Sequence, residues 1–158
     1  MSNARNLANL LGTGTQITTA DIADGAFQAN KNLIINGAMQ VAQRGTSSTG
    51  LGASEGYYTV DRFQLGVGGT ATAGRLTMSQ DSDAPIGFGS CIKLACTTAD
   101  TSIAADENLR LITVLEGQNL QAFKKGTANA ESMTLSFYVK GNSSATYVIE
   151  LYDTDNAR

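Results

Sequence analysis

The chain has 158 residues, of which 42% are hydrophobic and only 16% are charged; it can therefore bury a core, and wholesale disorder is excluded. The net charge of −3 argues against a protein that binds nucleic-acid phosphates through a basic surface. No apolar run approaches the roughly 18 residues of a membrane-spanning helix, and no secretory signal pattern is present, so we expect neither membrane insertion nor secretion.

The residue types argue against an enzyme. The sequence contains no histidine, which excludes catalytic sites that pair serine or cysteine with histidine, and the usual zinc sites. Acidic pairs such as Asp81 with Asp83 are interpreted as solvated turn residues, with a calcium site or a glycosidase pair as the alternatives. We therefore expect no catalytic residues, no metal and no cofactor.

Cys91 and Cys96 are the two cysteines, and both fall in one expected strand. Five residues of strand separate their Cα atoms by about 16 Å, which is beyond the roughly 7 Å that a disulfide spans. We expect two buried free thiols in a protein made in a reducing cytoplasm.

The first expected element is a short helix over residues 2–11, where Leu7, Leu10 and Leu11 lie on one face and Gly12 ends the helix. A helix of this length is not stable alone in water. Its leucines are therefore predicted to pack on copies of the chain or on another protein.

An extended segment follows, in which Ile17, Ile22 and Phe27 recur at intervals that fit neither a helix nor a strand. One interpretation is an ordinary linker. The other is an extended segment whose apolar residues pack against copies of themselves around a symmetry axis. We assign residues 1–31 to one N-terminal segment for attachment and trimerisation, separate from the folded part of the chain.

From Asn32 the pattern becomes that of short strands separated by Gly, Ser and Asn turns, which predicts a mainly β fold, an antiparallel β-sandwich, over residues 32–158. A glycine-rich stretch at 46–58 is expected to be a flexible loop, and residues 116–126 a short helical turn with Leu120 and Phe123 facing inward. The expected strands are 32–43, 59–67, 74–80, 90–97, 109–117, 133–141 and 145–153.

The last expected strand, 145–153, is apolar on both faces, as in a central strand of a sheet. A jelly roll uses eight strands, one more than the sequence pattern supplies. We therefore expect the sandwich to be incomplete at its C-terminus, or to take a strand from a neighbouring chain.

Tyr57 and Tyr58 follow the glycine-rich stretch and are the candidate glycan contacts, with half-buried strand residues as the alternative interpretation. Arg44, Asp61 and Arg62 are interpreted as structural. A partly buried Arg44 is expected to form a bidentate pair with a carboxylate or to cap loop carbonyls, and Asp61 to lie near a strand end or to be hydrogen-bonded.

Four blocks in order, "NLIINGAMQVAQRGTSS", "YTVDRFQL", "VLEGQNLQAF" and "MTLSFYVKG", resemble a sandwich module of phage tail-fibre proteins. The resemblance covers roughly Asn32 to Asp153, and Phe63 stands where the family commonly has tryptophan. The module looks like carbohydrate-binding jelly rolls. The stretch "ITTADIADGAFQANK" also resembles segments of trimeric phage fibre proteins.

These resemblances imply a structural protein of a virion, the virion-attached part of a tail fibre, made in the host cytoplasm and assembled as a homotrimer. The implied partners are a tail adaptor, a portal-proximal protein or a baseplate protein. The alternatives are a carbohydrate-binding module that contacts host surface glycans, or a capsid decoration or head-fibre protein.

Overall fold

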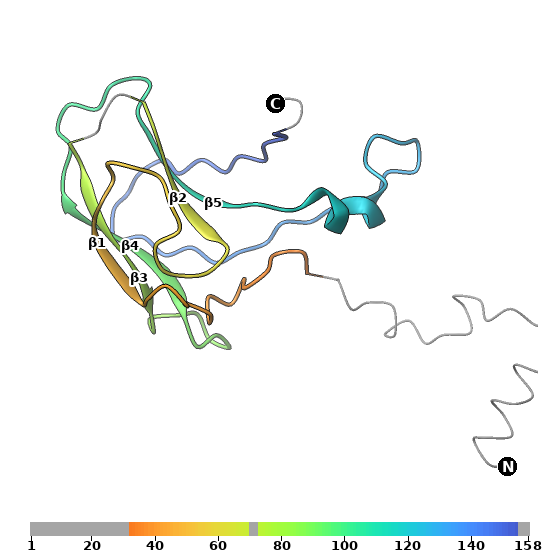
Figure 1. The fold of residues 1–158 in the computed structure, drawn as a ribbon, viewed down its shortest axis with the longest axis horizontal. Helices are drawn as coiled ribbons and strands as arrows, with labels where there is room; N and C mark the ends of the chain where they lie inside the picture. The colour runs from red at the N-terminus through yellow and green to blue at the C-terminus, as the bar shows by residue number, and fades with distance from the viewer. Residues whose placement is uncertain (1–31, 70–72, 155–158) are drawn as a thin grey trace, which may run out of the picture.

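The computed structural model describes residues 32–69 and 73–154. The expected helix at 2–11 and the extended segment with Ile17, Ile22 and Phe27 lie outside the described residues, as do Leu7, Leu10 and Leu11. Within them the fold is mainly β with antiparallel sheets, as predicted (Figure 1). Its elements are β1 Ser47–Leu51, β2 Phe63–Gly68, β3 Arg75–Asp81, β4 Cys91–Thr98, β5 Asn108–Thr113 and the 3₁₀ helix η1 Gly117–Phe123.

One sheet has three strands in the order β1-β3-β4. The hairpin β3–β4 pairs Met78 with Leu94, and β1 pairs Ser48 with Met78 from the other side. The Thr77 hydroxyl donates to Thr49 Oγ1 across β1 and β3 at 3.0 Å. The polar face of β3 therefore stabilises the pairing with β1, while its apolar face is free to enter the core.

The second sheet pairs β2 with β5 in continuous antiparallel register, from Phe63 opposite Thr113 to Gly68 opposite Asn108. A Cβ at Gly66 would lie 2.5 Å from Cδ1 of Ile112, so a larger residue here would displace the end of that side chain. The absence of a side chain at Gly66 leaves space for Ile112 on its partner strand.

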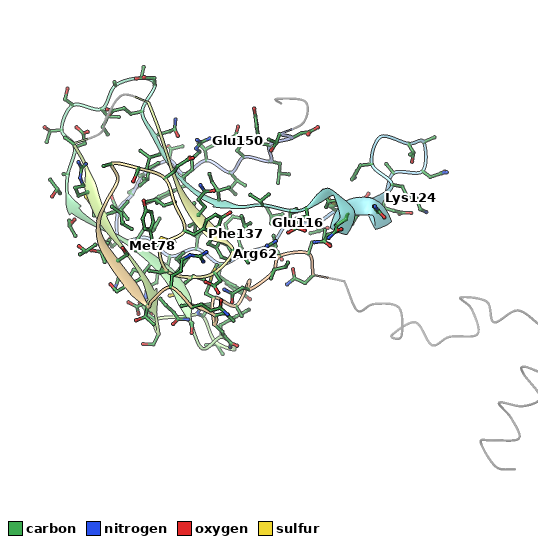
Figure 2. The ribbon with its side chains drawn as sticks, in the orientation of Figure 1. Arg62, Met78, Glu116, Lys124, Phe137 and Glu150 are labelled. Carbon is green, nitrogen blue, oxygen red and sulfur yellow. The ribbon has the colours of Figure 1, made fainter. Side chains whose placement is uncertain are left out.

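The core lies between the two sheets. Leu51 of β1, Leu76 and Met78 of β3, and Leu65 of β2 form one buried cluster, in which Met78 points inward from its sheet (Figure 2). Alternate residues of β3 are buried, as expected for a strand with one face on a core. Two antiparallel sheets that share a core are consistent with the predicted β-sandwich.

The predicted strand at 32–43 is wrong. Asn36 and Met39 have positive φ angles of 59° and 56°, and the Met39 N–H donates to the Asn36 carbonyl at 2.9 Å, closing a turn. Asn36-Gly37 is a turn dipeptide, and this local chemistry outweighs the apolar content of the segment.

The glycine-rich stretch 46–58 is not wholly a loop, because β1 lies within it. Gly50 and Gly52 have φ angles of 72° and 130°, and the register with β3 shifts between Ser48 and Leu51. The glycines therefore accommodate an irregularity inside a strand, where the sequence had predicted a flexible connection.

The predicted strands 133–141 and 145–153 are extended but belong to neither sheet. After η1 the chain returns towards the sheets (Figure 1), where Lys140 Nζ lies 2.7 Å from Asp83 Oδ2 and the rings of Tyr138 and Phe88 meet edge to face. Alternation of apolar and polar residues fixes which side chains share a face, but a strand also needs a partner. None pairs with these segments among the residues described.

The helical turn is confirmed as η1, in which Leu120 and Phe123 are half-buried. Cys91 and Cys96 are free, as predicted, but the expectation that both are buried is wrong. Cys91 is half-buried and Cys96 is exposed, because β4 is an edge strand of its sheet.

Candidate functional site

The site begins at the turn that precedes β2. Arg62 has a φ of 73°, a left-handed conformation that is uncommon for a residue other than glycine. The predicted strand over 59–67 therefore starts late, at Phe63. The turn directs the Arg62 side chain towards Glu116, and Figure 2 shows the two side chains lying close together.

Asp61 attaches the segment at 36–44 to this turn. Its backbone N–H donates to the Val41 carbonyl at 2.9 Å, and its carboxylate oxygen Oδ1 lies 3.3 Å from both the Gln43 N–H and Arg44 Nη1. Arg44 therefore pairs with a carboxylate, as expected, but through one nitrogen rather than in the bidentate geometry that was expected of a partly buried arginine. Asp61 is hydrogen-bonded at the end of a strand, as expected.

Arg44 also lies against Tyr57. Its guanidinium carbon is 5.6 Å from the centroid of the Tyr57 ring, within the range of a cation–π contact. Tyr57 nevertheless remains 41% exposed, so the contact with Arg44 does not bury it.

Two adjoining hollows share Tyr57 and Arg62. The first, of about 240 Å³, is also lined by Arg44 and Asp61. The second, of about 200 Å³, is also lined by Val114 and Glu116. We call the combined site the tyrosine cleft; its residues are Arg44, Tyr57, Asp61, Arg62, Val114 and Glu116.

The charges of the tyrosine cleft balance. Arg44 pairs with Asp61 at 3.3 Å, and Arg62 pairs with Glu116 at 3.1 Å. The Arg62 and Glu116 side chains are 38% and 49% exposed, so their pair is worth about 0–1 kcal/mol. In the other pair Arg44 is 54% exposed, whereas the Asp61 side chain is only 16% exposed and is the more shielded of the four.

Tyr57 and Tyr58, predicted together as glycan contacts, have different environments. Tyr57 lines both hollows. Tyr58 packs against the core, and its hydroxyl donates to the Ser54 carbonyl at 2.9 Å. Only the Tyr57 ring is placed to contact a ligand in the tyrosine cleft.

Sequence reasoning missed Val114 and Glu116 and gave Arg44, Asp61 and Arg62 purely structural roles. Glu116 is the N-cap of η1 but makes no side-chain capping hydrogen bond; its carboxylate instead accepts from Arg62. The one sequence feature that could have indicated Glu116 is its position as an acidic residue near the end of the expected strand 109–117, directly before a glycine.

The acidic residues weighed as a calcium or glycosidase pair are bound to lysines. Lys93 Nζ lies 2.9 Å from Asp81 Oδ2, and Lys140 Nζ lies 2.7 Å from Asp83 Oδ2. The hydrogen bond from Lys93 is the main cause that lowers the pKa of Asp81. Nearby, partial burial raises the pKa of the Cys91 thiol, which favours its neutral form.

Residues 32–69 and 73–154 hold no cluster of three metal-ligating side chains of the His, Cys, Asp and Glu types. This part of the chain also has no helix of the length and apolar character that crossing a membrane requires.

Comparison with known proteins identifies no relative of the chain. No family model matches the chain, and neither a curated protein nor a solved structure shows significant similarity to it.

Proposed function

We propose that this chain is a structural protein of a phage virion, part of a tail fibre, which assembles as a homotrimer and has no enzymatic activity. The observation that carries the proposal is the apolar surface of two extended segments, 133–139 and 147–152. We call them the assembly segments.

The assembly segments expose large apolar side chains to solvent. In the first, apolar residues alternate with polar ones, and Val139 is 76% exposed; in the second, Val148 is 85% exposed. Covering a side chain of this size stabilises a protein by about 1.5–3 kcal/mol. A surface with this much exposed apolar area is typical of an interface.

We propose that the apolar side chains of the assembly segments are covered by other copies of the same chain. Each copy carries both segments, and each segment is extended and rich in strand-forming residues. Segments of this kind can add as strands to a sheet edge of a neighbouring subunit. Among the described residues, β5 pairs only with β2, so its other edge is available for such a strand. When such head-to-tail contacts close, they form a ring of identical subunits.

Attachment to the virion is assigned to residues 1–31, with Leu7, Leu10 and Leu11 as the predicted contacts. The same segment is expected to contribute to trimerisation through Ile17, Ile22 and Phe27. These residues are outside the described structure, and the assignment rests on the leucine pattern and on the resemblance to fibre proteins. The absence of enzymatic activity rests on the lack of histidine and on the pairing of Asp81 and Asp83 with lysines.

Native mass spectrometry of the full chain tests the proposal. We expect a trimer for the wild type and a shift to monomer for Leu135→Asp, which places a charge among apolar residues of the first assembly segment. Ser136→Asp is the matched control on the opposite face of the same segment and should remain trimeric. A monomeric wild type contradicts the homotrimer, and a trimeric Leu135→Asp variant removes this segment from the interface.

A further inference from the structure

The chain between η1 and the first assembly segment forms an exposed loop that carries two adjacent lysines. Residues 124–130 have the sequence KKGTANA, and all of them are exposed. Figure 1 shows η1 and this loop lying away from both sheets, and Figure 2 places Lys124 at that end of the molecule, well away from Met78 of the core. We call residues 124–130 the lysine loop.

The lysine loop is held by hydrogen bonds that stay within it or close its base. The Glu131 N–H donates to the Phe123 carbonyl at 2.9 Å and joins the two ends of the loop. Inside it, the Thr127 N–H donates to the Lys124 carbonyl at 3.2 Å. Because none of these bonds reaches a sheet, the loop can open locally without loss of strand pairing. Exposed loops of small and polar residues are the preferred sites of proteolytic cleavage.

Within the lysine loop, the peptide bond between Lys125 and Gly126 is the less protected one. The Lys124 carbonyl accepts from both the N–H and the hydroxyl of Thr127, at 3.2 and 2.7 Å. The Lys125 carbonyl accepts no hydrogen bond among the described residues. A Cβ at Gly126 would meet nothing within 4 Å, so the backbone after Lys125 is uncrowded and accessible to a protease.

Most other basic residues of the described chain lie where a protease cannot extend the backbone. Those in paired strands are Arg75 of β3, Lys93 of β4 and Arg110 of β5. Those of the tyrosine cleft, Arg44 and Arg62, lie in segments that backbone hydrogen bonds fasten to each other. Cleavage at these positions requires the sheets or the cleft to unfold first.

Lys140 is the strongest competing site, because it lies in an extended stretch outside both sheets. Its Nζ, however, donates to both carboxylate oxygens of Asp83, at 2.9 and 2.7 Å. A protease that cuts after lysine draws the lysine side chain into its own pocket, so at Lys140 it must break this contact with the rest of the fold. The Lys125 side chain donates only to the Glu131 carbonyl at the base of its own loop.

The position of the lysine loop decides what a cut would separate. The buried apolar residues of the described chain all precede it, from Leu51 to Met78. Both assembly segments, 133–139 and 147–152, follow it. A cut between Lys125 and Gly126 therefore leaves the core in one fragment and both assembly segments in the other.

We propose that the Lys125–Gly126 bond is a processing site for an endoprotease that cuts after lysine, and that cleavage there detaches the assembly segments covalently from the folded part. A serine protease with an acidic primary pocket fits, because such a pocket binds the lysine ammonium. Water adds to the Lys125 carbonyl carbon, the bond to the Gly126 nitrogen breaks, and a carboxylate and an amine remain. The position of the cut is independent of the homotrimer, whereas its effect on assembly rests on the proposed function.

Limited digestion of the full chain with trypsin tests the proposal, because trypsin cuts after lysine and arginine alike and so tests every basic residue. Mass spectrometry of early time points identifies the fragments. Within residues 32–154, we expect the first cut to give a fragment that begins at Gly126. The cut protein should keep the far-ultraviolet circular dichroism of a β protein. A first cut after Lys140, or loss of the β spectrum on cleavage after Lys125, would overturn the proposal.

Three variants locate the cut. Lys125→Gln should abolish the fragment that begins at Gly126, whereas Lys124→Gln should still produce it. Lys93→Gln, in the paired strand β4, is the matched control and should be cut like the wild type. A Lys124→Gln variant that resists cleavage would move the site to the preceding bond and contradict the assignment. Native mass spectrometry of the uncut chain measures the oligomeric state separately, so a monomer would contradict the homotrimer without affecting the processing site.

Discussion

Thr59 is a polar residue that is completely buried just before the turn of the tyrosine cleft. Its hydroxyl oxygen has no hydrogen-bond partner among the described residues. A buried hydroxyl loses its bonds to water on folding, and nothing in its surroundings here compensates for that loss. Thr59 is therefore a position where the native residue lowers stability.

We predict that Thr59→Val raises the free energy of unfolding by about 1 kcal/mol, because valine has nearly the same shape and no group to leave unsatisfied. The midpoint of urea unfolding measures the change. Thr77→Val is the control, because the Thr77 hydroxyl donates to Thr49 and its removal should not stabilise the protein. A Thr59→Val variant less stable than the wild type would show that the hydroxyl has a partner in solution.

Single residues also show the limits of prediction from sequence. Tyr57 and Tyr58 are adjacent and both come directly after the glycine-rich stretch, so the same exposure is expected for both from the sequence. The structure separates them, because the Ser54 carbonyl accepts from the Tyr58 hydroxyl and the core lies beneath the Tyr58 ring. Such contacts depend on how the chain folds back on itself, which local patterns do not encode.

The β3–β4 hairpin has charged groups fixed at both of its ends. At one end, the hydrogen bond from Lys93 lowers the pKa of Asp81. At the other, hydrogen bonds from the Ser102 and Ala73 N–H groups lower the pKa of Asp100. Ion-paired carboxylates raise the pKa of Lys93 and of Lys140.

These shifts predict how stability depends on pH. Asp81 and Asp100 have lower pKa values folded than unfolded, so their contribution is complete at neutral pH and is lost as pH falls below about 4. The lysines have higher pKa values folded than unfolded, so their contribution is lost as pH rises above about 10.4. Urea midpoints measured across this range should therefore form a plateau that falls at both ends.

The Asp81→Asn variant isolates one carboxylate of the hairpin. It should be less stable than the wild type at neutral pH and show a shallower fall in acid, because the lost group can no longer bind a proton. Glu55→Gln, an exposed acid with no ion pair among the described residues, is the control and should retain the wild-type curve. Identical acid limbs for Asp81→Asn and the wild type would assign the fall to other groups.

Among the elements, four strands were predictable from their patterns: β3 and β4, which are neighbours in sequence, and β2 and β5, which overlap the expected strands at 59–67 and 109–117 and pair over a long sequence separation. The alternating patterns at 74–80 and 90–97 correspond to β3 and β4, which form a hairpin. The equally clear alternation at 133–139 does not produce a strand within the described chain. The sequence shows which face of a strand is apolar, but the pairing depends on contacts that lie far away in sequence or in another molecule.

At the scale of the whole molecule, the buried core is small. Its apolar members over residues 32–69 and 73–154 are Leu51, Val60, Phe63, Leu65, Leu76 and Met78. A small core gives limited stability to an isolated chain, and large apolar side chains remain exposed elsewhere. A small core together with many exposed apolar side chains favours a protein that buries these side chains only when its subunits assemble.

Because residues 1–31 are assigned to attachment and residues 32–158 to the folded sandwich, we predict that a chain lacking residues 1–29 still folds but no longer attaches. The deleted form should retain the far-ultraviolet circular dichroism of a β protein, because the core residues all lie after this segment. It should be missing from purified virions, which immunoblotting of the particles would measure. Replacement of Leu7, Leu10 and Leu11 by serine is the finer test, and normal incorporation of either form would contradict the assignment.

The Asn36-Gly37 turn gives the folded domain a site of chemical ageing. Glycine offers little steric protection to its own amide nitrogen, which can attack the side-chain carbonyl carbon of asparagine and expel ammonia. The cyclic succinimide that forms is then opened by water, which leaves a carboxylate. In the native fold, Asn36 Nδ2 donates to the carbonyls of Val41 and Asp61, each at 2.9 Å. Deamidation would replace this donor with a negatively charged oxygen facing two acceptors, so an aged molecule would release the segment that carries Arg44 from the turn that carries Arg62.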